Sequence, residues 1–172
     1  MRTLATAGCI VCLSLAGLAV ADSRARSVHA NLSGFQEVPA VSTVARGDFV
    51  ARVNPANTEL RYEISYSDLE GSVTMAHIHL GQKSVNGGIM IWLCGTAGVP
   101  GPAGTPVCPV SGSVTRTVTA ADVVGPSGQG VDAGQFAEAL RAIRAGFAYA
   151  NVHSSKWPGG EIRGQIRDED ND

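Results

Sequence analysis

The fold class is decided by a short stretch that reads Leu60-Arg61-Tyr62-Glu63-Ile64-Ser65-Tyr66. Apolar or aromatic side chains alternate with polar ones along it, and successive side chains of a β-strand point to opposite faces of a sheet. The stretch therefore predicts a strand with one face in the core and the other in solvent. The preceding stretch, residues 46–53, alternates around Phe49 and ends at residues 54–57, which have the composition of a turn. Both stretches indicate a fold built from short β-strands.

Six further short stretches have the composition of strands: residues 28–32, 72–80, 89–93, 111–118, 147–152 and 161–166. Strands this short and this evenly spaced predict a mainly β fold, an antiparallel immunoglobulin-like sandwich or barrel.

One or two short helices are expected between these strands. Residues 119–122 have the pattern of a capped helical turn, with Thr119 as the N-cap. Residues 132–145 predict a longer helix that Asp132 caps and that Gly146 ends. Its apolar side chains form a stripe suited to core packing: Phe136, Leu140 and Ile143.

The first 21 residues predict a secretory signal peptide. Arg2 precedes an apolar run from Leu4 to Val20, and small residues form a cleavage site before Asp22. The run is shorter than the roughly 20 apolar residues that a membrane span needs. We therefore expect a secreted or periplasmic protein with no stable membrane span once the peptide is cleaved.

The rest of the chain predicts one domain, residues 22–167, followed by an acidic disordered tail, residues 168–172. The net charge is −2, and no basic patch is present that would bind nucleic acid. The partner expected from these features is an unidentified extracellular or periplasmic protein.

Cysteine use agrees with export. Cys9 and Cys12 lie in the predicted signal peptide, which leaves Cys94 and Cys108. An isolated pair in an exported protein most often forms a disulfide. The bond would close a Gly- and Pro-rich loop, residues 95–107. In the chain-entropy model, a disulfide that closes a loop of that size stabilises the folded protein by about 3 kcal/mol. Such a loop on a rigid scaffold would also suit the contact surface of an adhesion or interaction module.

The histidines indicate a candidate metal site. His77 and His79 are two apart in a predicted strand and share one face, and His153 lies in a second predicted strand. If those strands are neighbours, three imidazoles converge, and three neutral nitrogens with one open coordination position suit Cu or Zn. A metal-free cluster, in which the histidines hydrogen-bond across strands, is an equally open interpretation.

Four other residues are candidates for support of this site or for structural pairing. Asn151 shares the face of His153, together with Tyr149, and would supply hydrogen bonds to the ligands. Arg163 would pair with Glu37 or Glu161 and so set the strand register.

An enzymatic role is the less favoured one, and no catalytic residue is assigned. A His-x-His strand also occurs in Cu,Zn superoxide dismutases, so a copper-dependent dismutase-like activity is a second alternative to the metal-free module. The two-metal site of those enzymes takes six histidines, whereas this chain has four. The fourth, His29, lies outside the motifs that carry the other three.

Several motifs, in this order, resemble the chordin (CHRD) domain. They are Asn31-Leu32-Ser33-Gly34 with Gln36-Glu37-Val38-Pro39, then Ala76-His77-Ile78-His79 with Gly81 and Asn86-Gly87, and finally Tyr149-Ala150-Asn151-Val152-His153 with Pro158-Gly159-Gly160-Glu161-Ile162-Arg163-Gly164. The resemblance runs from about Val28 to Ile166 and is to the single-domain, bacterial-type exported form. It implies a β-rich, immunoglobulin-like or barrel-like extracellular module. In animals such modules are repeated inside chordin, a growth-factor antagonist.

Overall fold

The computed structural model describes residues 27–168, and it is a mainly β structure with one α-helix. The strands are β1 (Ser27–Ser33), β2 (Arg46–Val53), β3 (Leu60–Ser67), β4 (Val73–Leu80), β5 (Ile89–Gly95), β6 (Gly112–Val118), β7 (Ala148–Ser154), β8 (Ile162–Gln165) and β9 (Arg167–Asp168). The helix is α1 (Phe136–Arg144), and the 3-10 turns are η1 (Gly34–Gln36), η2 (Ala120–Asp122) and η3 (Ser127–Gln129). Each stretch expected to be a strand coincides with an observed strand to within two residues.

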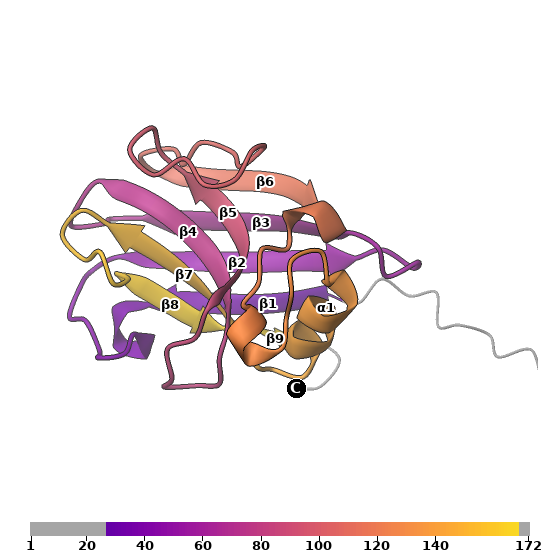
Figure 1. The fold of residues 1–172 in the computed structure, drawn as a ribbon. Helices are drawn as coiled ribbons and strands as arrows, with labels where there is room; N and C mark the ends of the chain where they lie inside the picture. Colours follow the sequence, from indigo (N-terminus) through magenta and orange to yellow (C-terminus); the bar gives the residue numbers. More distant parts are fainter. Residues whose placement is uncertain (1–26, 169–172) are drawn as a thin grey trace, which may run out of the picture.

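The strands form one antiparallel sheet that curls until it is nearly a closed barrel (Figure 1). The order across the sheet is β5-β4-β7-β8-β1-β2-β3-β6, with β9 beside β1. Edge strand β5 meets the segment after β6 through a bridge between Ile91 and Val123. A second link is the disulfide between Cys94 on β5 and Cys108 just before β6. The sheet therefore has little free edge left between β5 and β6.

The core fills the inside of this barrel. Buried and exposed residues alternate along β2 and β3, as the sequence predicts, and Phe49 and Tyr62 are almost fully buried. Burying a side chain of this size stabilises the fold by roughly 1.5–3 kcal/mol. The Tyr62 hydroxyl donates to the Leu93 carbonyl at 2.5 Å and so satisfies the polar end of the ring inside the core.

Helix α1 lies at one end of the barrel, next to β9 (Figure 1). Its apolar stripe is buried as expected, but the helix starts at Phe136 and not at Asp132. Gly134 has φ of +83°, a left-handed conformation that an α-helix cannot contain. The expected C-terminal stop is confirmed, since Gly146 has φ of +74° and its N–H bonds to the Ile143 carbonyl. The capped turn at residues 119–122 is also present.

One residue of the predicted acidic tail belongs to the sheet. Asp168, assigned to the tail from sequence, lies in β9, pairs with Val28 and is 3% exposed. The remainder of the tail and the predicted signal peptide lie outside the described residues. Within residues 27–168 we find no helix with the length and apolar character of a membrane span.

Candidate metal centre

The three candidate ligands come from two neighbouring strands. His77 and His79 lie on β4 and His153 on β7, and these strands pair antiparallel with His77 opposite Asn151. The residues that precede His77 and His79 in the strand, Ala76 and Ile78, point into the core. The adjacency on which convergence depends is therefore present, and all three imidazoles stand on the outer face of the barrel.

The ring nitrogens are close enough to surround one ion. One nitrogen from each of the three histidines lies within 4.8 Å of the other two. The Nδ1 of His77 and the Nε2 of His153 are 3.4 Å apart. Two nitrogens bound tetrahedrally at 2.0–2.1 Å from one Zn²⁺ would be about 3.3 Å apart. This pair already has the spacing of two ligands.

Hydrogen bonds select the tautomer of two of the rings. Nδ1 of His79 lies 3.0 Å from the Gly87 carbonyl, and Nδ1 of His153 lies 3.0 Å from the Pro158 carbonyl. A carbonyl only accepts, so each Nδ1 carries the hydrogen and each Nε2 presents a lone pair. The Nε2 atoms of His77 and His79 are buried and have no hydrogen-bond partner.

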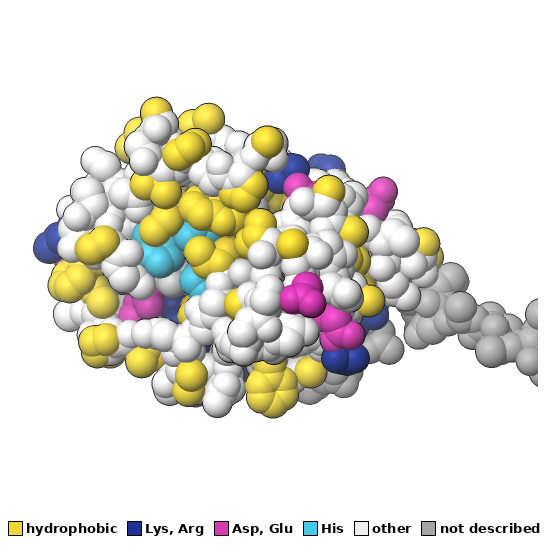
Figure 2. Space-filling model, viewed as in Figure 1, with side chains coloured by type: hydrophobic (Ala, Val, Ile, Leu, Met, Phe, Trp, Pro, Cys, Tyr) yellow, Lys and Arg dark blue, Asp and Glu magenta, His cyan; other side chains and the backbone are white. Residues whose placement is uncertain are grey.

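Burial keeps the imidazoles neutral. His77, His79 and His153, which form the cluster, are 0%, 8% and 6% exposed. Figure 2 shows histidine side chains gathered at one place on this face of the molecule, bordered by hydrophobic side chains. Loss of solvation lowers the pKa of His77 to about 2 and that of His79 to about 4, and it also lowers the pKa of His153. The neighbouring imidazoles lower the pKa values of His77 and His79 further. Neutral imidazole is the form that binds metal ions.

A stack of side chains holds His79. The ring of Tyr149 lies parallel to it, and the guanidinium of Arg163 lies 3.4 Å from the centre of the Tyr149 ring. The Tyr149 hydroxyl accepts the Gly87 N–H at 3.1 Å. Because the Gly87 carbonyl accepts from His79, Tyr149 supports the same imidazole through its ring and through its hydroxyl.

Arg163 also holds the loop that carries Gly87. Its guanidinium donates to the carbonyls of Gln82 and Val85 and to the Asn86 side chain, at 2.9–3.2 Å. The hydrogen bonds of Arg163 thus go to loop oxygens, which the local pattern of β8 does not reveal. The expected partner Glu37 interacts with Arg163 through charge, because each of the two groups shifts the pKa of the other. Arg163 also reaches the histidine site through its contact with the Tyr149 ring.

The two candidate carboxylates, those of Glu37 and Glu161, have different surroundings. Glu37 accepts a hydrogen bond from Asn151 at 2.5 Å, and Asn151 donates also to the Ile162 carbonyl. Burial raises the pKa of Glu37 to about 7, against the lowering by Asn151 and Arg163. Glu161 is fully buried and accepts from the Glu70 N–H and the Thr43 hydroxyl, which links two loops.

His29 is not part of the cluster. It lies on β1, opposite Val50 of β2, and strands β7 and β8 separate β1 from β4. It therefore does not supply the fourth ligand that a dismutase-like copper site in this chain would need.

Sequence reasoning misses Trp92, which touches the site directly. Trp92 lies opposite His77 on β5, and its indole meets the imidazole edge to face with ring centres 4.2 Å apart. The run Ile89–Leu93 is apolar throughout, so its composition does not show which residues face outward. The pairing of β5 with β4 is what brings Trp92 onto the histidine face.

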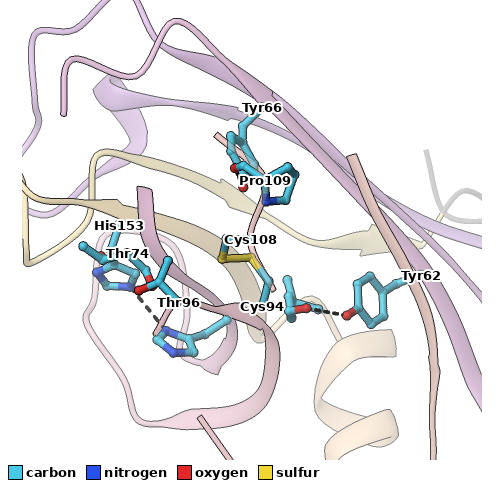
Figure 3. Close-up of a disulfide and its surroundings, with 10 residues drawn as sticks. Tyr62, Tyr66, Thr74, Cys94, Thr96, Cys108, Pro109 and His153 are labelled. Atoms are coloured by element: carbon cyan, nitrogen blue, oxygen red, sulfur yellow. Dashed lines mark hydrogen bonds between the residues drawn. A yellow bond between two sulfur atoms is a disulfide. The ribbon is translucent and has the colours of Figure 1, made fainter. Parts of the chain in front are cut away.

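The disulfide expected from the sequence is present between Cys94 and Cys108 (Figure 3). It ties down the loop of residues 95–107, which packs over Trp92. A Cβ atom added at Gly101 would collide with the indole ring, so the backbone lies directly against it. The loop thus lies on the Trp92 side of the site, and the disulfide anchors it from the core.

Comparison with known proteins supplies one match. The family model of the CHRD domain matches residues 28–166. No curated protein and no solved structure gives a match. The matched region includes β1 through β8 and all three clustered histidines, and the chain therefore belongs to the CHRD domain family.

Proposed function

We propose that this CHRD domain is an exported binding module that holds one Cu or Zn ion through His77, His79 and His153. The observation that carries the proposal is the cluster of three buried imidazoles, of which two are oriented by backbone carbonyls so that Nε2 presents its lone pair to the cluster. Imidazoles fixed in this way by a second hydrogen bond are typical of metal ligands.

The hydrogen-bond balance favours a metal over a metal-free cluster. The Nε2 of His79 is buried without a partner, and an unsatisfied buried polar group costs roughly 1–3 kcal/mol. Histidines that served only to join strands would be expected to pair this atom, as Nδ1 of His77 and Nε2 of His153 lie within hydrogen-bond distance of each other. A cation between the three rings would satisfy the lone pair of His79 and those of its neighbours at once.

The disulfide supports the proposed location. Disulfides persist in the oxidising surroundings of the periplasm and the cell exterior and are rare in the cytosol. Export in turn makes soft thiol ligands scarce, since both described cysteines are bonded to each other. Imidazole nitrogens are then the natural ligands for a transition metal.

Metal titration tests the proposal. We expect the purified, metal-stripped protein to bind one equivalent of Cu(II) or Zn(II) by calorimetry, with elemental analysis of the dialysed complex giving the same ratio. The triple variant His77→Ala, His79→Ala, His153→Ala is expected to bind none. His29→Ala is the matched control, because it removes a histidine outside the cluster. Equal binding by the wild type and the triple variant would overturn the proposal.

Binding of another protein is a second candidate function, and exposed apolar side chains near the disulfide favour it. Val107 and Val110 flank Cys108 and are 77% and 89% exposed. Apolar side chains beside a tied loop suit contact with another extracellular protein. A photocrosslinking residue at position 107 should trap a defined partner on intact cells, whereas the same residue at position 50 on β2 should not. Equal labelling from both positions would count against this surface.

A further inference from the structure

We infer that the ion is copper in the cuprous state and that the thioether of Met75 is its fourth ligand. The inference rests on the proposed three-histidine site and adds the metal and the remaining ligand. A soft thioether favours Cu(I), whereas zinc sites in proteins use thiolate, imidazole and carboxylate ligands.

The register of β4 and β7 places Met75 beside the histidines. Met75 pairs with His153, and the pairing continues without interruption to His77 and beyond. Ala76 is fully buried in the core, so its neighbours Met75 and His77 both face outward. Directly opposed residues of an antiparallel pair have Cβ atoms about 4.5–5.5 Å apart, which lets a methionine sulfur reach the space in front of the opposite imidazole.

A β-bulge puts Met75 on that face. Val73 pairs with Ser154 and Met75 with His153, so two residues of β4 advance against one residue of β7 and Thr74 is the extra residue. Val73 lies in the core cluster. In a regular strand Val73 and Met75 would share a face, and Met75 would also point into the core. The bulge turns Met75 toward the histidines.

The bulge is fixed by the disulfide-tied loop. The Thr96 hydroxyl donates to the Thr74 carbonyl at 3.1 Å, and both residues lie beside the disulfide and His153 in Figure 3. On the β5 side, Met75 pairs with Gly95, which has no side chain to compete for space. Met75 itself is half-buried and does not belong to the core cluster. Packing in the core cluster therefore does not account for the position of its thioether.

Trp92 completes the soft surroundings. Its indole lies against His77, and the loop of residues 95–107 covers it. The apolar ring excludes water from that side of the site. A dry site with one sulfur and three imidazoles suits Cu(I) better than a strongly hydrated divalent ion.

The test compares Cu(I) and Zn(II) binding in methionine variants of the whole chain. Cu(I) is supplied anaerobically from a bicinchoninate complex, and Zn(II) is titrated separately. We expect Met75→Leu to weaken Cu(I) binding by at least about tenfold, which corresponds to about 1.4 kcal/mol. Zn(II) affinity is expected to stay the same. Met90→Leu is the matched control, since Met90 is fully buried in the core and a Leu–Met exchange preserves volume.

X-ray absorption gives a second readout that does not depend on affinity. The Cu(I) complex of the wild type should show a sulfur neighbour of copper that is lost in Met75→Leu and kept in Met90→Leu. Cu(I) and Zn(II) affinities that are both unaffected in Met75→Leu, with no sulfur neighbour in the wild type, would overturn the assignment of Met75 and leave the three-histidine site standing. A wild type that binds neither ion would overturn both proposals.

Discussion

The imidazole of His79 and the ring of Tyr149 lie flat against each other, with centres 4.8 Å apart and planes 3° apart. The two residues are direct cross-strand partners on β4 and β7. The contact links a candidate metal ligand to Arg163 on β8, whose guanidinium lies over the same tyrosine ring. The orientation of His79 thus depends on side chains from three strands.

Tyr149→Phe isolates the role of the hydroxyl. The ring stack on His79 remains, but the Gly87 N–H loses its acceptor, and the carbonyl that orients His79 becomes less firmly held. Loss of such an outer hydrogen bond lowers metal affinity by about tenfold or more. Calorimetric titration should show this decrease. A variant with unchanged affinity would mean that the ring alone orients the imidazole.

Gly87→Ala is expected to destabilise the fold and weaken the site together. A Cβ atom at Gly87 would overlap the Leu80 carbonyl, so the backbone must shift away from His79. Forced overpacking of this kind costs roughly 1–3 kcal/mol. Urea unfolding measures the loss of stability, and titration measures the loss of metal affinity. Gly98→Ala is the matched control, because an added Cβ there meets nothing within 4 Å.

Glu37→Gln changes the pH dependence of stability. Burial raises the pKa of Glu37 from its ordinary value of 4.5 to about 7 in the folded protein. The contribution of the protonated side chain to folding stability is therefore fully present below pH 4.5 and is lost as the pH rises to 7. Glutamine does not ionise and can still accept from Asn151. The stability of the variant relative to the wild type should therefore increase between pH 4.5 and 7, by up to about 1.4 kcal/mol per pH unit.

Denaturant unfolding at several pH values, in metal-free protein, measures this difference. Glu63→Gln, on the exposed side of β3, serves as the control for removal of a carboxylate. If the stability of the variant relative to the wild type falls with rising pH, the hydrogen bond from Asn151 stabilises the ionised carboxylate more than burial destabilises it.

Reduction of the disulfide is expected to lower the free energy of unfolding by about 3 kcal/mol, because the bond joins two residues that are 14 positions apart in the sequence. The wild type with the bond oxidised is compared with the same protein after reduction, so no side chain is removed. Tryptophan fluorescence of a Trp157→Phe variant, in which Trp92 is the remaining tryptophan, should report release of the loop from the indole. Unchanged fluorescence on reduction would show that the loop keeps its place without the bond.

Much of the fold follows from local patterns. Alternation along residues 60–66 places Tyr62 and Ile64 in the core, and the structure buries both. The predicted start of the helix at Asp132 is wrong. Asp132 is a residue type that commonly caps helices, but Gly134, two residues later, adopts a left-handed conformation. Composition indicates which residues can cap a helix, but the backbone path between barrel and helix selects the one that does.

The sequence alone places His77 and His79 on one strand face, because side chains alternate in any strand. It also determined the cysteine pair, because only Cys94 and Cys108 follow the predicted signal peptide. The position of β7 beside β4, which brings His153 to the pair, follows from long-range contacts and not from the local pattern. The same holds for the carbonyls of Gly87 and Pro158, which select the tautomers, and for the partners of Arg163. These contacts join segments distant in the chain or depend on loop backbone, and local periodicity carries no information about which loop carbonyl will face which ring.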